Sequence, residues 1–66
     1  MLTIVLTNRE REVLALVGQG QTSKQIASTL NISVCTINNH RKRICKKLDL
    51  HSTAQLVAFA VMQSAD

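Results

Sequence analysis

The chain has 66 residues, a net charge of +4 and an isoelectric point near 9.7, with 45% hydrophobic and 18% charged residues. A chain of this length buries only about 60% of its unfolded surface, so it has room for one core but not for an enclosed catalytic pocket. We therefore expect one domain over residues 1–66 that is not an enzyme. Phe59 is the only aromatic residue, which excludes the stacking platforms of many single-strand-binding folds.

Both cysteines, Cys35 and Cys45, are expected to be free thiols. They are ten residues apart in one predicted helix, a rise of about 15 Å that a disulfide cannot span. A zinc site that adds His40 fails because each step of five residues turns a helix by about 140°. We expect no metal or cofactor. Free thiols and the lack of a signal peptide or membrane-spanning run favour a cytoplasmic protein that does not bind membranes.

Four helices are predicted from their caps. Capping boxes, in which a hydroxyl and an acid or amide three residues later satisfy the first free amides of a helix, occur at Thr7/Glu10, Thr22/Gln25 and Ser52/Gln55. Ser33 starts another helix, where Ile32 and Ile37 can form a hydrophobic staple. These signals predict an all-α domain with helices over 8–18, 23–30, 34–48 and 53–64. Residues 1–6 are a linker or an N-terminal extension.

Apolar residues gather on one face of each of the first three predicted helices at helical spacing. The predicted core residues are Val13, Leu14, Leu16, Val17, Ile26, Ala27, Leu30, Ile37, Ile44 and Leu48. Glu10 lies on the inner side of the first helix, where an unpaired acid is costly. We expect Glu10 to cap its own helix and to meet a basic partner such as Arg41 of the third helix, with capping alone as the alternative.

The last predicted helix has two apolar faces, whereas a surface helix needs only one. Core spacing favours Leu56, Val57, Ala60 and Val61 for the inner face. The opposite face predicts a two-fold homodimer through Gln55, Ala58, Phe59 and Met62. The alternative is that Phe59 and Met62 pack on the apolar segment Ile4–Leu6.

Positive charge is concentrated in the middle of the chain. From Val13 to Leu48 there are six basic residues and no acid, whereas the remainder has two basic and four acidic residues. In the third predicted helix the side opposite the core carries Cys35, Asn39, Lys42 and Lys46, flanked by Asn38 and Arg43. A merely solvated face normally mixes both signs of charge. A short helix, a tight turn and a helix with a basic outer face form the pattern of a helix-turn-helix.

The whole pattern resembles the LuxR-type DNA-binding domain of bacterial regulators, the FixJ/NarL and GerE-like group. The resemblance rests on Leu6-Thr7-x-Arg9-Glu10-x-Glu12-Val13-Leu14-x-Leu16-Val17, Gly20, Lys24-x-Ile26-Ala27, Leu30-x-Ile32-Ser33-x-x-Thr36-Ile37-x-x-His40 and Ile44-x-x-Lys47-Leu48. It implies four helices, a helix-turn-helix formed by the second and third, and a homodimer contact in the fourth. It also implies a place at the C-terminus of a larger protein, after a phosphoacceptor or ligand-sensing domain.

Candidate DNA contacts follow from positions on the predicted helices. Asn38, Asn39 and Lys42 lie on the outward face in the first half of a recognition helix, where side chains reach base edges; solvated amides are the alternative for the asparagines. The family often has Lys at the position of Asn38, whose amide can instead pair with adenine. Arg43 and Lys46 are expected to contact phosphates, and Lys47 to contact a phosphate or solvent.

The start of the second helix is a further predicted phosphate site. Thr22, Ser23 and Lys24 combine free amides with a basic side chain, although Thr22 also serves as a cap. Cys35 points toward the groove, and Thr36 either contacts DNA or caps. His40 is expected to pack or to face a phosphate.

The sequence therefore predicts sequence-specific binding of double-stranded DNA by the output domain of a bacterial transcription regulator that positions RNA polymerase. Two alternatives are a promoter-reading domain like that of a sigma factor, and a protein-interaction module that uses residues 53–64. An enzyme is disfavoured because no nucleophile has a neighbouring base and no carboxylates are paired.

Overall fold

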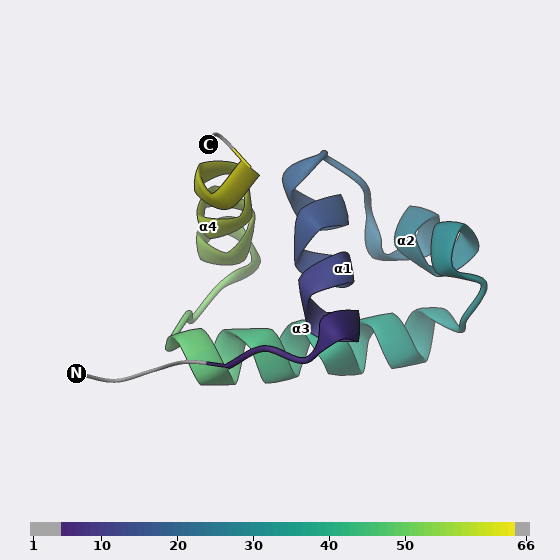
Figure 1. The fold of residues 1–66 in the computed structure, drawn as a ribbon, viewed down its shortest axis with the longest axis horizontal. Helices are drawn as coiled ribbons and strands as arrows, with labels where there is room; N and C mark the ends of the chain where they lie inside the picture. The colour runs from purple at the N-terminus through teal and green to yellow at the C-terminus, as the bar shows by residue number, and fades with distance from the viewer. Residues whose placement is uncertain (1–4, 65–66) are drawn as a thin grey trace.

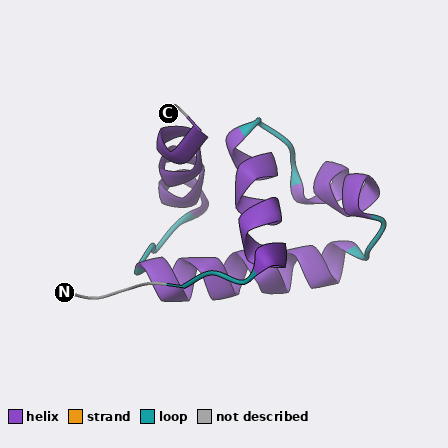
Figure 2. Ribbon diagram, in the orientation of Figure 1, coloured by secondary structure: helices purple, strands orange, loops and turns teal. Residues whose placement is uncertain are grey.

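A computed structural model describes residues 5–64 of the chain, and within this range it contains helices but no strand (Figure 2). The helices are α1 (Asn8–Gly18), α2 (Ser23–Leu30), α3 (Val34–Leu48) and α4 (Thr53–Ser64). The all-α prediction and the four predicted ranges are confirmed. Residues 1–4, which belong to the predicted linker, lie outside the described residues, and so does the predicted contact of Phe59 and Met62 with Ile4.

The helix starts use the predicted caps. Thr7 Oγ1 accepts a hydrogen bond from the Glu10 amide at 3.1 Å, and Glu10 Oε1 accepts one from the Thr7 amide at 2.9 Å. Thr22 and Gln25 form the same reciprocal pair. In α3, Ser33 Oγ accepts from the Thr36 amide at 3.1 Å. These bonds satisfy amides that have no partner inside a helix.

The capping box predicted for α4 is only half correct. Ser52 Oγ accepts from the Gln55 amide at 3.1 Å, as expected. Gln55 Oε1, however, accepts from the amide of His51 at 2.6 Å, one residue earlier than the capping box requires. The Gln55 side chain therefore fastens the turn that enters α4.

The turns after α2 and α3 are tight because a single residue in each adopts the left-handed conformation. Asn31 has a φ of 58° and Asp49 a φ of 56°. Asn and Asp tolerate this region better than other residues that carry a side chain. Each turn redirects the chain within a few residues, so that α2 lies near the N-terminal end of α3 and α4 stands over its C-terminal end (Figure 1).

Helix α3 forms a base across which the other helices are arranged. Figure 1 shows α1 and α4 standing side by side over α3, with α2 near its N-terminal end. Helix α1 contacts all three other helices. The first turn of α1 lies near α3, and its second half rises away from it (Figure 1).

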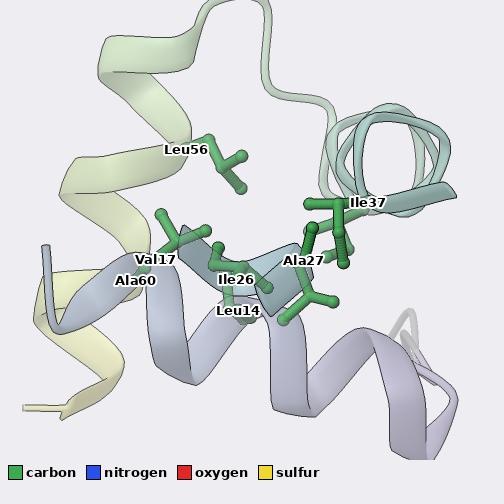
Figure 3. Close-up of a cluster of buried hydrophobic side chains, with 9 residues drawn as sticks. Leu14, Val17, Ile26, Ala27, Ile37, Leu56 and Ala60 are labelled. Atoms are coloured by element: carbon green, nitrogen blue, oxygen red, sulfur yellow. The ribbon is translucent and has the colours of Figure 1, made fainter. Parts of the chain in front are cut away.

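One hydrophobic core joins the four helices. Figure 3 shows side chains from α1 (Leu14, Val17), α2 (Ile26, Ala27), α3 (Ile37) and α4 (Leu56, Ala60) meeting in one cluster. Val13 and Ile44 complete the buried set, and Leu16, Leu30 and Leu48 pack against it. The predicted core of α1, α2 and α3 is confirmed.

The predicted core face of α4 is partly wrong. Leu56 and Ala60 are buried as expected, but Val57 and Val61 are 36% and 49% exposed. Phe59, predicted to lie on the outer face, packs against the core instead. Because α4 carries apolar residues on two faces, spacing alone could not select the buried stripe. Within residues 5–64, none of the helices is long and apolar enough to cross a membrane.

Candidate nucleic-acid interface

The outward face of α3 is a continuous exposed surface without an acidic group. Its exposed members are Cys35, Thr36, Asn38, Asn39, Lys42, Arg43 and Lys46. Ile37 and Ile44, which have none of their surface exposed, anchor the opposite side in the core. Helix α3 contains no Asp or Glu. The structure therefore brings the predicted α3 candidates together on one basic and amidic face, which we call the α3 outer face.

A hydrogen bond between side chains ties α3 to the start of α2. Arg41 Nη1 donates to Ser23 Oγ at 3.0 Å, and both residues are half-buried. A basic partner for Glu10 is present, as expected, but it is not Arg41, the residue suggested for that role. Arg41 binds a side chain of α2, whereas Glu10 belongs to α1. The bond holds the two helices of the helix-turn-helix together at its polar edge.

Glu10 pairs with Lys47 instead. Lys47 Nζ lies 2.7 Å from Glu10 Oε1, and only 2% of the Glu10 side chain is exposed. The hydrogen bond from Lys47 is the main cause of a lowered pKa for Glu10, helped by the backbone hydrogen bond from Thr7 and opposed by burial. Lys47 Nζ also lies 3.4 Å from the carbonyl oxygen of Val5.

Lys47 therefore stabilises the fold by pairing with Glu10, whereas the sequence predicted that it contacts a phosphate or solvent. The sequence signal was the inward position of Glu10, which required a cation. It did not identify which one, because α3 carries basic residues on several sides.

The start of α2 exposes one cation beside two engaged hydroxyls. Lys24 is exposed, whereas Ser23 Oγ receives the Arg41 hydrogen bond. Thr22 is exposed and caps α2. At the start of α3, Thr36 Oγ1 lies 2.8 Å from Ser33 Oγ, but the cap itself is Ser33, which accepts from the Thr36 amide. A hydroxyl that caps a helix retains lone pairs and can still meet a ligand at its exposed side.

The remaining chemistry-bearing residues of α3 show no catalytic arrangement. Cys35 and Cys45 are free thiols, the first exposed and the second half-buried against the core. His40 is half-buried, and its Nδ1 atom is buried without a hydrogen-bond partner within the described range. In residues 5–64 no three His, Cys, Asp or Glu side chains are close enough to hold a metal ion.

The outer face of α4 is apolar and largely exposed. Met62 is 74% exposed, and Val57, Ala58 and Val61 are also exposed. Of the predicted dimer residues, Ala58 and Met62 lie on this surface. Gln55 is exposed while its amide oxygen binds the His51 amide. Phe59 is half-buried. We call Val57, Ala58, Val61 and Met62 the α4 outer face; Val57 and Val61 are members that sequence reasoning assigned to the core.

Comparison with known proteins agrees with this geometry. The family described as "Bacterial regulatory proteins, luxR family" matches residues 4–60, which include all of α1, α2 and α3 and most of α4. The chain belongs to this family. It is a LuxR-type helix-turn-helix domain, a DNA-binding domain of bacterial transcription regulators, so the resemblance seen in the sequence is confirmed. Membership favours this class over the sigma-factor alternative and over an enzyme.

Similar proteins are response and transcriptional regulators. An uncharacterized response regulatory protein, YgeK, from Escherichia coli K12 is 48% identical over 85% of this chain and 38% of its own length. The transcriptional regulatory protein MctR of Rhizobium johnstonii is 45% identical over 85% of the chain and 26% of its own length. The transcriptional regulatory protein TdiR of Thauera aromatica is 44% identical over 97% of the chain and 28% of its own length. The LuxR-type domain thus spans between a quarter and two fifths of these relatives.

Proposed function

We propose that this domain reads double-stranded DNA by inserting α3 into the major groove. The observation that carries the proposal is the α3 outer face, which is exposed along the helix, contains no acid and is backed by a fully buried apolar stripe. A major groove about 12 Å wide admits a single helix, and an acid-free face avoids repulsion by the phosphates on both sides. The buried stripe fixes the orientation of that face relative to the rest of the domain.

Different parts of the interface have different tasks in this proposal. Asn38, Asn39 and Lys42 read base edges, because amide and ammonium groups in the N-terminal and middle parts of a recognition helix reach the groove floor. The phosphate contacts come from Arg43 and Lys46 on α3 and from Thr22, Ser23 and Lys24 at the start of α2, with Cys35 and Thr36 at the rim where α3 begins. Phosphate contacts supply affinity for any duplex, and base contacts supply preference.

We further propose that the domain is the output module of a larger cytoplasmic regulator that helps to position RNA polymerase. This rests on the response and transcriptional regulators among its relatives, of which it covers only a part. Two copies pair through the α4 outer face, which supplies apolar surface of the kind that homodimer interfaces bury.

Selection from a random duplex library, with the bound pool sequenced after several rounds, tests DNA reading and pairing together. We expect enrichment of two inverted half-sites about one helical turn apart, because a two-fold dimer reads a two-fold site. A single enriched half-site would retain the reading and remove the dimer. Salt-sensitive retention without enrichment would reduce the α3 outer face to a general polyanion contact and favour the protein-interaction alternative.

Met62→Asp tests the dimer itself. A carboxylate in the middle of an apolar contact is expected to shift sedimentation to the monomer, because its charge would have to be desolvated on pairing. Met62 is a cleaner position than Phe59, because Phe59 packs on the core and its replacement also destabilises the fold. Asn8→Asp, an equal charge change at the start of α1, is the control and should leave the association state unchanged.

A further inference from the structure

A hollow of about 570 Å³ opens between α3 and the start of α4. Its cationic lining comes from Arg41, Lys42 and Lys46 of α3; His51, in the turn before α4, also lines it, and none of its lining residues is acidic. Asp49 does not line the hollow, but its Oδ1 lies 3.3 Å from Nε2 of His51, which does. A concave surface that gathers basic groups and excludes acids attracts an anion more strongly than a flat basic surface does.

Arg41 is already held in position at the edge of this hollow. One guanidinium nitrogen, Nη1, donates to Ser23 Oγ at 3.0 Å. The guanidinium is a rigid fork with five donors, so fixing one nitrogen orients the others and lowers the entropy lost when they bind an oxyanion. Arg41 also joins the hollow to Ser23, one of the phosphate contacts proposed at the start of α2.

The N-terminal end of α4 borders the hollow. Ser52 and Thr53 line it, and Ser52 Oγ caps the amide of Gln55. The first amides of a helix have no partner inside the helix, and the helix dipole favours a negative charge beside them. The hollow therefore combines two lysines, a guanidinium held by Ser23 and the N-terminal end of a helix, which together suit a phosphate group.

We propose that this hollow is a phosphate-binding site and that its phosphate belongs to the DNA backbone beside the groove occupied by α3. The assignment to DNA rests on the proposed function, since Asn38, Lys42 and Lys46 belong both to the hollow and to the α3 outer face. The DNA contact surface then extends beyond the helix-turn-helix to His51, Ser52 and Thr53. A free phosphorylated small molecule is the other source of the same group, and the volume suits one.

Substitution of Thr53 with opposite charges tests the site. Thr53→Glu should weaken binding of a random-sequence duplex about tenfold, and Thr53→Lys should strengthen it, because each places a charge where the phosphate lies. For Thr53→Glu, the slope of log affinity against log salt should become shallower by about 0.9, the value for one lost phosphate contact. Glu in the first turn of a helix is favourable, so this variant should fold.

Ala15→Glu and Ala15→Lys are the matched controls. Ala15 is exposed in the second half of α1, which rises away from α3 (Figure 1), so these variants report the effect of net charge alone. Effects at Thr53 that exceed those at Ala15 support the backbone assignment. If the two sets agree, the DNA backbone does not occupy the hollow.

Titration of the DNA-free domain with inorganic pyrophosphate, followed by amide NMR at residues 51–54, provides the second arm. Saturable shifts that Thr53→Glu removes would support a phosphate site even where duplex affinity is insensitive to Thr53, and would assign it to a free phosphorylated molecule. No shifts, together with agreement between the Thr53 and Ala15 variants, would overturn the proposal. Failure of the unaltered domain to bind any duplex would overturn the proposed function, whereas the pyrophosphate result would still decide the hollow.

Discussion

Helices α3 and α4 bury similar stripes in one core and expose opposite chemistries. Helix α3 anchors itself with Ile37 and Ile44, and α4 with Leu56 and Ala60. The α3 outer face is basic and amidic, whereas the α4 outer face is apolar. Burial alone therefore does not distinguish the two helices. Their exposed faces do, since one suits a polyanion and the other an apolar partner surface.

The largest effect should come from removing the buried stripe of α4. Leu56→Ala is expected to destabilise the domain by about 3 kcal/mol, because it deletes a side chain from a close-packed core and leaves a cavity. Val61→Ala on the α4 outer face should change stability by less than about 0.5 kcal/mol. Urea unfolding followed by circular dichroism, at concentrations low enough to keep the chain monomeric, measures both. Equal losses would mean that α4 has no distinct inner and outer sides.

Two neighbouring lysines allow a structural residue and a surface residue of α3 to be compared in the same way. Lys47→Met should cost about 2 kcal/mol of stability, because it leaves the buried Glu10 carboxylate without its cation. Lys46→Met, next along the chain on the α3 outer face, should cost less than about 0.5 kcal/mol while weakening DNA binding. Adding Glu10→Gln to Lys47→Met should recover part of the loss, since the unpaired charge is then gone. No recovery would show that Lys47 acts through its other contacts.

The same pair predicts a dependence of stability on pH. The Lys47 hydrogen bond holds the Glu10 pKa below its ordinary value, so the folded state binds this proton less readily than the unfolded chain does. Its contribution is complete above the unfolded value of about 4.3 and is lost as pH falls through the lowered folded value. Urea midpoints measured across the acid range should decline more steeply for the unaltered domain than for Glu10→Gln. If the urea midpoints of the two proteins fell equally with pH, Glu10 would not cause the loss of stability in acid.

The difference in polarity between the two sides of a helix decides how well its buried side can be predicted from the sequence. The sides of α3 were predictable because polar and apolar residues alternate at helical spacing, and the helix bounds because the cap residues are explicit. The inner side of α4 was predictable only in part: spacing selected Leu56 and Ala60, but apolar residues on two faces left the choice between Phe59 and the two valines to tertiary packing. The partner of Glu10 and the hollow beside Arg41 depend on how helices cross, which local patterns do not encode.

The smallest and most selective effects should separate residues within the α3 outer face. Asn39→Ala is expected to cost about 1 to 2 kcal/mol on the preferred duplex and to relax preference at one base position, because it removes a contact to a base edge. Lys46→Ala should weaken preferred and random duplexes by similar factors, since phosphates are present in every sequence. Competition binding of the two variants against a panel of single-base substitutions distinguishes these outcomes. A change of base preference in Lys46→Ala would move the base-reading part of α3 toward its C-terminal half and would place Asn39 among the solvated amides.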